Sequence, residues 1–516
     1  MMRHEKWSLQ AAALAAALAL ALTGCGGFAG TSASGAASAA SDSGAASASG
    51  SSAQGSALDD GRLRLLYGST ASTATIFCGA QPVYTAPAGG TAYLLMQTNA
   101  DGTTQEARYF VSGEPQGTDQ YHYAIHRADG SVAYDCTGTE NPVGIAGDWV
   151  LLHEDQWSEG MTNGSTAAKF VDLATGETRS APDAATNFFD AGGGCYVVSC
   201  TNYTDAGEFQ ASAYLYDTAL QQTKMFENCY ANEGPDGWIW LNAVTGGTGE
   251  TDTLGTLYNV STGRQIENIM QDCGGGSVCV RRDDGTYAVV RLSDGGTEAE
   301  CERVCYWYAG GSLLLYNGTD SSLYYLLQRA DGTTAPVYAY QRGDDGAMYL
   351  LLADSVEVYG TDGALRYAVD VRLPATAAGA GCYVTPLSDG SVLVESSLWQ
   401  EGSDYQDRYA IYGKNGMLRD FPNGTYSSLY RDSGSGLLVG MRDTAGGRWV
   451  YDLLDDSGSV RLSGLAFVAD DGCGDGILAA RRGFEEGWMD EDSGQWLWSR
   501  GVWQQTGGED GGTFYY

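Results

Sequence analysis

Three tryptophans near the C-terminus have the residue type and spacing of a binding surface. Trp488, Trp496 and Trp498 lie among acidic side chains. Trp496 and Trp498 alternate with Leu497, so we expect both rings on one face of a strand. An exposed aromatic surface beside carboxylates can stack on a sugar ring and hydrogen-bond its hydroxyls. Alternatively, these rings fill the interface between neighbouring sheets or join the first sheet to the last.

The histidines and the common catalytic motifs give no strong indication of a catalytic or metal site. His122 and His126 are an even number of residues apart, so on a strand they share a face and could approach a metal together. No acidic residue stands near them in a known metal spacing, and we expect neither a metal site nor a cofactor. The chain has no G-x-S-x-G, Walker or H-E-x-x-H motif, so we assign no catalytic residue and favour a protein that is not an enzyme.

The N-terminus carries a targeting signal. Arg3 and Lys6 precede twelve residues of Ala and Leu, 11–22, which are too few to span a bilayer comfortably and suit a signal peptide. The segment ends in Leu-Thr-Gly-Cys at residues 22–25, which resembles the lipobox of bacterial lipoproteins. The resemblance implies that residues 1–24 are removed and that Cys25 carries a lipid at the extracytoplasmic face of the cell membrane. The alternatives are an ordinary cleaved signal with a chance cysteine, or a buried hydrophobic helix.

Eleven of the twelve cysteines remain if Cys25 is lipidated, and an odd number cannot all pair within the chain. Three pairs are close in sequence and could bridge in an oxidising compartment. They are Cys195 with Cys200, Cys273 with Cys279, and Cys301 with Cys305. None forms a C-x-x-C motif, which excludes zinc-ribbon and thioredoxin-type sites. The alternative is that most are buried free thiols that pack as small apolar groups.

The chain then divides into a tether and a repeat region. Residues 26–57 are almost entirely Gly, Ala and Ser with Asp42 as the one charge, so we expect residues 25–57 to form a flexible linker with a reach of roughly 30 Å. From residue 58 to residue 516, apolar runs alternate with glycine turns. The turn glycines are Gly130, Gly176, Gly263, Gly295, Gly332, Gly363, Gly416, Gly458 and Gly494.

The spacing of these turns predicts a β-propeller. Nine steps, counting one variant turn at residues 215–217, cover the 364 residues from Gly130 to Gly494, a mean period close to 40. Small all-β units of this period must stack on their neighbours around an axis, and we count about ten of them. The alternatives are a pair of smaller β domains, or fewer blades with extra hairpins.

The turn sequences also resemble a known repeat family. Asp172-Leu-Ala-Thr-Gly176 and Asn259-Val-Ser-Thr-Gly263 are similar to the turns of quinoprotein-like β-propeller repeats. The resemblance implies one all-β propeller over residues 58–516 with seven or eight blades. Within the stretch that leads into Gly176, Asp172 is expected to cap the turn with its side chain, and Gly176 to supply a positive φ.

Charge excludes some partners. Without Arg3, Lys6 and Glu5 the chain has 26 basic and 63 acidic side chains, a net charge of −37. This repels phosphate, so we expect no nucleic-acid partner and no electrostatic attachment to anionic lipid.

The sequence therefore predicts a monomeric, lipid-anchored β-propeller at the bacterial cell surface that binds a protein or an envelope glycan. One alternative is an extracytoplasmic glycan-active hydrolase or lyase whose carboxylates gather at the mouth of the propeller channel. Another is a chaperone-like assembly scaffold with an exposed apolar patch or a free strand edge.

Overall fold

The fold is described from a computed structural model. The described residues are 58, 60–67, 74–87, 89–98, 105–116, 121–156, 165–203, 209–235, 237–244, 251–317, 325–371, 381–398, 406–432, 435–444, 449–468 and 476–501. All of them belong to one compact unit, residues 52–516. The signal peptide, Cys25 and the linker up to residue 57 lie outside them. Within the described ranges the structure has no helix long and apolar enough to cross a membrane.

The described residues form 42 strands arranged in ten antiparallel sheets, which we number in chain order. Sheets 1 to 4 contain β1 (Leu63–Tyr67), β2 (Ala74–Cys78) and β3 (Gln81–Thr85); β4 (Thr91–Thr98), β5 (Gln105–Pro115), β6 (Tyr121–Arg127) and β7 (Val132–Asp135); β8 (Glu140–Ala146), β9 (Trp149–Gln156), β10 (Ser165–Asp172) and β11 (Thr178–Ser180); and β12 (Ala185–Asp190), β13 (Cys195–Tyr203), β14 (Phe209–Asp217) and β15 (Gln222–Glu227).

Sheets 5 to 7 contain β16 (Cys229–Glu233), β17 (Trp238–Val244), β18 (Thr251–Asn259), β19 (Gln265–Gly274), β20 (Ser277–Arg281), β21 (Tyr287–Arg291) and β22 (Thr297–Cys301); β23 (Cys305–Ala309), β24 (Ser312–Tyr316), β25 (Tyr325–Gln328) and β26 (Thr334–Val337); and β27 (Ala339–Arg342), β28 (Met348–Leu351), β29 (Ser355–Tyr359) and β30 (Leu365–Asp370).

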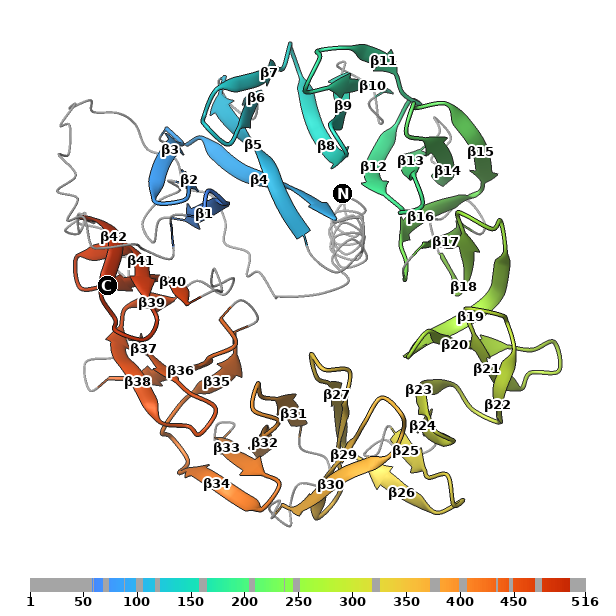
Figure 1. The fold of residues 1–516 in the computed structure, drawn as a ribbon, viewed down its shortest axis with the longest axis vertical. Coiled ribbons are helices and arrows are strands. Elements are labelled where there is room, and N and C mark those ends of the chain that lie inside the picture. The colour runs from blue at the N-terminus through green and yellow to red at the C-terminus, as the bar shows by residue number, and fades with distance from the viewer. Residues whose placement is uncertain are drawn as a thin grey trace, which may run out of the picture. The chain divides into compact units, whose positions relative to one another are not determined.

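Sheets 8 to 10 contain β31 (Cys382–Pro386), β32 (Val392–Leu398), β33 (Gln406–Gly413) and β34 (Gly416–Phe421); β35 (Ser428–Arg431), β36 (Leu438–Asp443), β37 (Trp449–Leu454) and β38 (Val460–Leu465); and β39 (Phe467–Val468), β40 (Ile477–Arg482), β41 (Glu485–Asp490) and β42 (Trp496–Gly501). In every sheet, consecutive strands are hydrogen-bonded neighbours. Figure 1 shows the sheets following one another around a common centre, which is the arrangement of a β-propeller.

The turns form as the sequence predicts. Between β10 and β11 a carboxylate oxygen of Asp172 accepts hydrogen bonds from the backbone N–H groups of Ala174 (2.8 Å) and Thr175 (3.0 Å), and Gly176 has a φ of 77°. A side chain bonded to its own turn, followed by a residue with positive φ, reverses the chain without help from outside the hairpin. The predicted Asp172 cap and Gly176 turn are therefore confirmed.

The apolar runs are buried on both faces of their strands. In β9, Leu151 packs in a core cluster with sheet 4, whereas its neighbours Val150 and Leu152 pack in a cluster with sheet 2. Successive side chains of a strand point to opposite faces, so a sheet with neighbours on both sides needs a continuous apolar run in its central strands. The described residues contain eleven core clusters, of which ten lie between consecutive sheets, including the last and the first, and one lies within sheet 5.

The expectation of seven or eight blades is not met. The described strands form ten sheets, and sheet 5 has seven strands because β19 pairs with both β18 and β20. The two halves of sheet 5 also pack on each other through Trp238, Leu257 and Val278. Seven or eight is the number of blades typical of the quinoprotein-like repeats that the turns resemble. The spacing of about 40 residues between turns had instead indicated about ten units.

Candidate functional site

Trp488 is buried and Trp498 is half-buried, and both rings pack against the first sheet. The Trp488 side chain is fully buried, and its ring lies edge-on to Phe77 of sheet 1 with 5.7 Å between centroids. Trp498 makes a similar contact with Phe77 at 4.7 Å. Arg500 adds a 2.9 Å hydrogen bond to Thr75 Oγ1 of sheet 1. Of the two alternatives for these rings, the structure shows the one in which they join the first sheet to the last.

Trp496 and Trp498 do not share a face, so that prediction is wrong. Trp496 packs in the core cluster between sheets 9 and 10, and Trp498 packs in the cluster between sheets 10 and 1. The cause is a β-bulge, because Trp488 pairs with Trp498 while the next residue, Met489, pairs with Trp496. The extra residue reverses the alternation between these two positions.

The three described histidines have structural partners. His122 Nε2 lies 2.8 Å from Asp135 Oδ1, and the buried His126 bonds Ser112 Oγ at 2.8 Å and stacks on Phe110. Four residues along a strand correspond to about 13 Å, too far for one metal ion to bind both His122 and His126. No group of three or more potential ligands that could hold a metal occurs among the described residues.

All ten described cysteines are free thiols, and most are buried. Cys25 and Cys473 lie outside the described residues. Cys195 and Cys200 pack in different core clusters. In contrast, Cys273, Cys279, Cys301 and Cys305 share the cluster between sheets 5 and 6.

The fold brings together one pair of carboxylates in sheet 8. In the β32–β33 register Glu395 is opposite Tyr409, and Ser397 is opposite Asp407, so the two acids are diagonal neighbours. Such positions are typically about 7–8 Å apart. Burial, together with the nearby Asp407 charge, raises the pKa of Glu395 to about 7. The Asp407 carboxylate accepts a 2.6 Å hydrogen bond from Ser397 Oγ.

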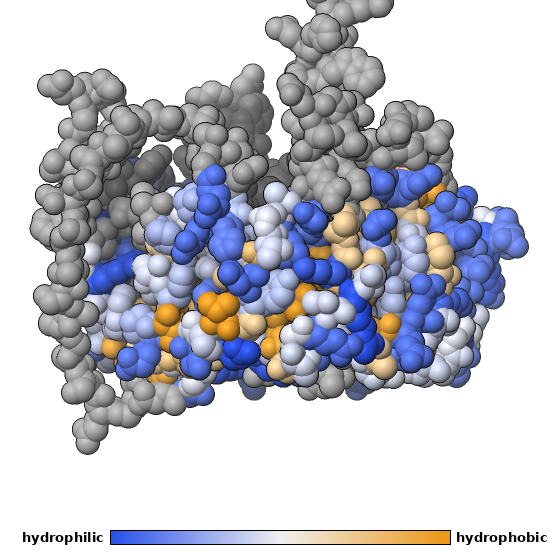
Figure 2. All heavy atoms as spheres, turned by 90° about the horizontal axis from the view of Figure 1, so that it is seen from above, coloured by the Kyte–Doolittle hydropathy of each residue, from blue (hydrophilic) through white to orange (hydrophobic). Residues whose placement is uncertain are grey.

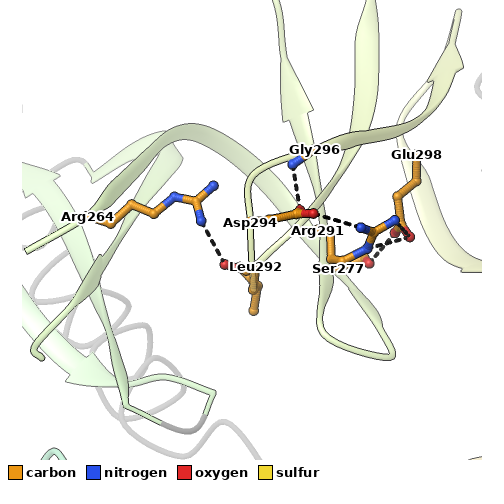
Figure 3. A network of polar contacts seen from close by, with 7 residues as sticks. All are labelled: Arg264, Ser277, Arg291, Leu292, Asp294, Gly296 and Glu298. Atoms are coloured by element: carbon orange, nitrogen blue, oxygen red, sulfur yellow. Dashed lines mark hydrogen bonds and ion pairs between the residues drawn. The ribbon is translucent and has the colours of Figure 1, made fainter. Parts of the chain in front are cut away.

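A network of polar contacts in sheet 5 also gathers charge. Figure 3 shows Arg291 between Asp294 (2.9 Å) and Glu298 (3.0 Å), with Ser277 Oγ also donating to Glu298. Arg264 reaches the Leu292 carbonyl at 3.3 Å. The Arg291 guanidinium and its two carboxylate partners satisfy one another's charges, and the contacts connect β20, β21 and β22. This network therefore holds the outer strands of the sheet together.

A hollow of about 440 Å³ lies at one end of sheet 4. Its polar lining residues are Asp183, Thr201, Asn202, Gln210, Ser212, Glu227 and Asn228. Amides and hydroxyls both donate and accept hydrogen bonds, and carboxylates accept them. The described lining residues include two carboxylates and no Lys or Arg, so the hollow suits a neutral or amine-bearing ligand with many hydroxyl groups.

The backbone of this hollow is constrained at two positions. Ala184 (φ 59°) and Asn228 (φ 55°) both line it with left-handed backbone, which costs free energy in residues other than glycine. Four non-glycine residues of the described chain have a positive φ, and two of them line this one hollow. Strained backbone that the surrounding structure holds in place is characteristic of binding sites.

Two further hollows are less suited to a ligand. One of about 360 Å³ contains Arg64 and Arg108, but Arg64 pairs with Asp60 at 2.7 Å and Arg108 bonds Gln97 at 2.9 Å. The other, of about 370 Å³, is lined by Ser457 and Arg461 beside the turn of β37 and β38, and Arg461 pairs with Asp492 at 2.9 Å. Arg108 also pairs with Asp148 at 3.3 Å, so all three of these arginines already have carboxylate partners.

The sequence analysis did not select the residues of the sheet 4 hollow. They lie at the ends of three different strands, and in type they do not differ from ordinary solvated turn residues. A possible signal was the pair of polar stretches that close one hairpin, Thr201–Asn202 and Gln210–Ser212.

Comparisons with known proteins identify no function. A family model described as "Domain of unknown function (DUF5046)" matches residues 257–509, just under half of the chain. No curated protein matches this chain.

Among solved structures, BamB from Moraxella catarrhalis is similar at 11% identity, covering 65% of this chain and 92% of its own, with a TM-score of 0.28. Sqt1 from Saccharomyces cerevisiae is similar at 10% identity, covering 69% of this chain and 92% of its own, with a TM-score of 0.25. Similarity at this level does not bear on function.

Proposed function

We propose that this chain is a lipid-anchored β-propeller at the extracytoplasmic face of a bacterial membrane that binds a neutral or amine-bearing glycan without chemistry of its own. The observation that carries the proposal is the 440 Å³ hollow of sheet 4, with its amides, hydroxyls and two carboxylates. In the view of Figure 2 the surface is mainly hydrophilic with small apolar areas, which favours a polar ligand.

The net charge supports the same ligand class. A mature chain with 63 acidic and 26 basic side chains repels anionic polymers and attracts cationic groups. The carboxylates of Asp183 and Glu227 would favour a free amine on the ligand, and Asn202 and Gln210 can hydrogen-bond sugar hydroxyls through donors and acceptors.

A glycan array tests this assignment. Labelled full-length chain is applied to neutral, amino-sugar and acidic oligosaccharides, and a hit is quantified by calorimetry. The double variant Asn202→Ala, Gln210→Ala is expected to bind about thirtyfold more weakly, because each of the two lost hydrogen bonds contributes about 1 kcal/mol. Ser457→Ala, in the 370 Å³ hollow, is the matched control and should bind normally. Binding only to acidic glycans, or to a protein and no glycan, would contradict the assignment.

The anchor has its own test. Cells expressing the full chain are grown with an alkyne-tagged fatty acid, and the protein is followed by labelling and membrane fractionation. Cys25→Ala should lose the label and leave the membrane fraction, because the lipobox cysteine is the expected acylation site. Cys78→Ala, at a half-buried cysteine of β2, is the control and should keep both.

A second candidate function rests on Glu395 and Asp407. A carboxyl with a pKa near 7 close to a second carboxyl group is the pairing that glycoside hydrolases use as acid and nucleophile or base. If the chain hydrolyses glycans, reducing ends should accumulate with the intact chain and fall at least about a hundredfold with Glu395→Gln, since general acid catalysis contributes about that much or more. Unchanged reducing ends across the same glycan panel would remove this candidate.

A further inference from the structure

Four cysteines that are up to 32 residues apart in the chain meet at the junction of sheets 5 and 6. Cys273 lies in β19, Cys279 in β20, Cys301 at the end of β22 and Cys305 at the start of β23. Three of these side chains are fully buried, and Cys301 is 7% exposed. They form most of one core cluster together with aliphatic residues such as Leu313.

Their contacts show how closely the cysteines approach. Cys273 Sγ donates to the Cys305 carbonyl at 3.2 Å, and the Cys305 N–H donates to Cys279 Sγ at 3.3 Å. The side chains of Cys273 and Cys279 therefore both lie beside the Cys305 backbone, and these two cysteines stand on the paired strands β19 and β20. Cys301 and Cys305 stand at the two ends of the short connection between β22 and β23, residues 302–304.

These positions make two neighbouring pairs, Cys273 with Cys279 on paired strands and Cys301 with Cys305 across one short connection. We propose that this cluster is a site of oxidative modification that forms two disulfides, Cys273–Cys279 within sheet 5 and Cys301–Cys305 between sheets 5 and 6. The alternative, one bridge from Cys273 to Cys305 across the two sheets, would leave Cys279 and Cys301 as free thiols.

The oxidant is a low-molecular-weight disulfide, and each bridge forms by two exchanges. One protein thiolate attacks a sulfur of the oxidant, forms a mixed disulfide and expels one thiolate. The second cysteine then attacks the protein sulfur and expels the other thiolate. The two protein thiol protons end on the two released thiols, and the oxidant is reduced by the two electrons that the cysteine pair loses.

In the folded chain the Cys305 sulfur is fully buried and donates a hydrogen bond to the Trp307 carbonyl at 3.0 Å, so an oxidant does not reach it there. The exchange therefore needs the junction of sheets 5 and 6 to open, or to be still unformed as it is during refolding.

Tryptic mapping distinguishes the possible pairings, because arginines separate the cysteines. Peptide 265–281 holds Cys273 and Cys279, peptide 292–303 holds Cys301, and peptide 304–329 holds Cys305. The full chain is incubated with glutathione disulfide, both as native protein and during refolding from urea. Remaining thiols are blocked with N-ethylmaleimide before digestion and mass spectrometry.

We expect peptide 265–281 to lose two hydrogens and carry no maleimide, and peptide 292–303 to appear linked to peptide 304–329. Cys136 and Cys382 lie in other core clusters and should carry maleimide, as internal controls. Cys305→Ser should abolish the second bridge and leave the first unchanged. The proposal is overturned if 265–281 is linked to 304–329, if all four cysteines carry maleimide in both arms, or if the purified chain holds a metal that is released when these thiols are blocked.

Discussion

Trp488 of the last sheet meets Phe77 of the first sheet edge to face, with 5.7 Å between ring centroids. The two residues are separated by most of the chain, and their contact closes the ring of sheets. Trp488 also contacts the core residues Leu58 and Leu66 on the sheet 1 side. Removing the Trp488 side chain should therefore open the interface between the last sheet and the first.

Trp488→Ala is expected to destabilise the protein by about 3–5 kcal/mol, the usual cost of removing a buried aromatic ring. Urea unfolding followed by tryptophan fluorescence and circular dichroism measures the loss. Phe484→Ala, at a ring that is 64% exposed, should change stability by less than about 0.5 kcal/mol. Equal losses in the two variants would show that the closing contact does not stabilise the ring.

Alanine substitutions at two glycines compare the cost of backbone strain with the cost of a steric clash. Gly176 has a φ of 77° and open space where a Cβ would be, so Gly176→Ala should cost only the strain of the left-handed backbone, about 1 kcal/mol. At Gly144 of β8, an added Cβ would lie 2.4 Å from the backbone oxygen of Phe188 in the neighbouring sheet. Gly144→Ala should therefore lose more stability in the same urea assay. The reverse order would mean that sheets 3 and 4 can separate at little cost.

The ion pair of Lys169 and Glu140 in sheet 3 contains a nearly buried carboxylate. Glu140 also accepts a 2.9 Å hydrogen bond from the Thr137 N–H. Lys169→Met leaves the Glu140 charge without its ion pair and should cost about 1–3 kcal/mol, less than a fully buried pair because the Lys169 side chain is 32% exposed.

The double variant Lys169→Met, Glu140→Gln removes both charges and should recover much of that loss. Thermal and urea unfolding of the two variants and the original chain compare these values. No recovery in the double variant would contradict the proposed charge effect.

Stability should fall as pH rises because of Glu395. Burial and the Asp407 charge together raise its pKa from 4.5 to about 7, whereas the unfolded side chain has the ordinary value. Between these pH values the folded state holds a proton that the unfolded state has lost, so the free energy of unfolding decreases from about pH 4.5 to pH 7 and then levels.

Glu395→Gln should remove part of this slope and be relatively more stable at pH 8 than at pH 5. Urea midpoints at pH 5, 6, 7 and 8 measure the effect. Glu491, whose pKa burial and Asp432 also raise to about 7, contributes a parallel slope, so Glu491→Gln is measured beside it. A Glu395→Gln profile parallel to that of the original chain would contradict the shift.

Local features were predictable because they depend on neighbours in the chain. The turn at Asp172 and Gly176 follows from a side chain that bonds its own backbone and a residue without a Cβ. The apolar run at Val150, Leu151 and Leu152 follows from a strand with sheets on both faces. Strand, turn and repeat were therefore determined by the sequence alone.

Only the tertiary structure decided which side chains meet. A one-residue bulge separates Trp496 from Trp498, and strict alternation along the sequence cannot show it. The number of sheets, the polar hollow beside Asn228 and the contact of Cys273 with Cys305 arise where different sheets pack. Such contacts depend on the geometry of the whole ring, because each sheet is placed by its neighbours and not by its own residues.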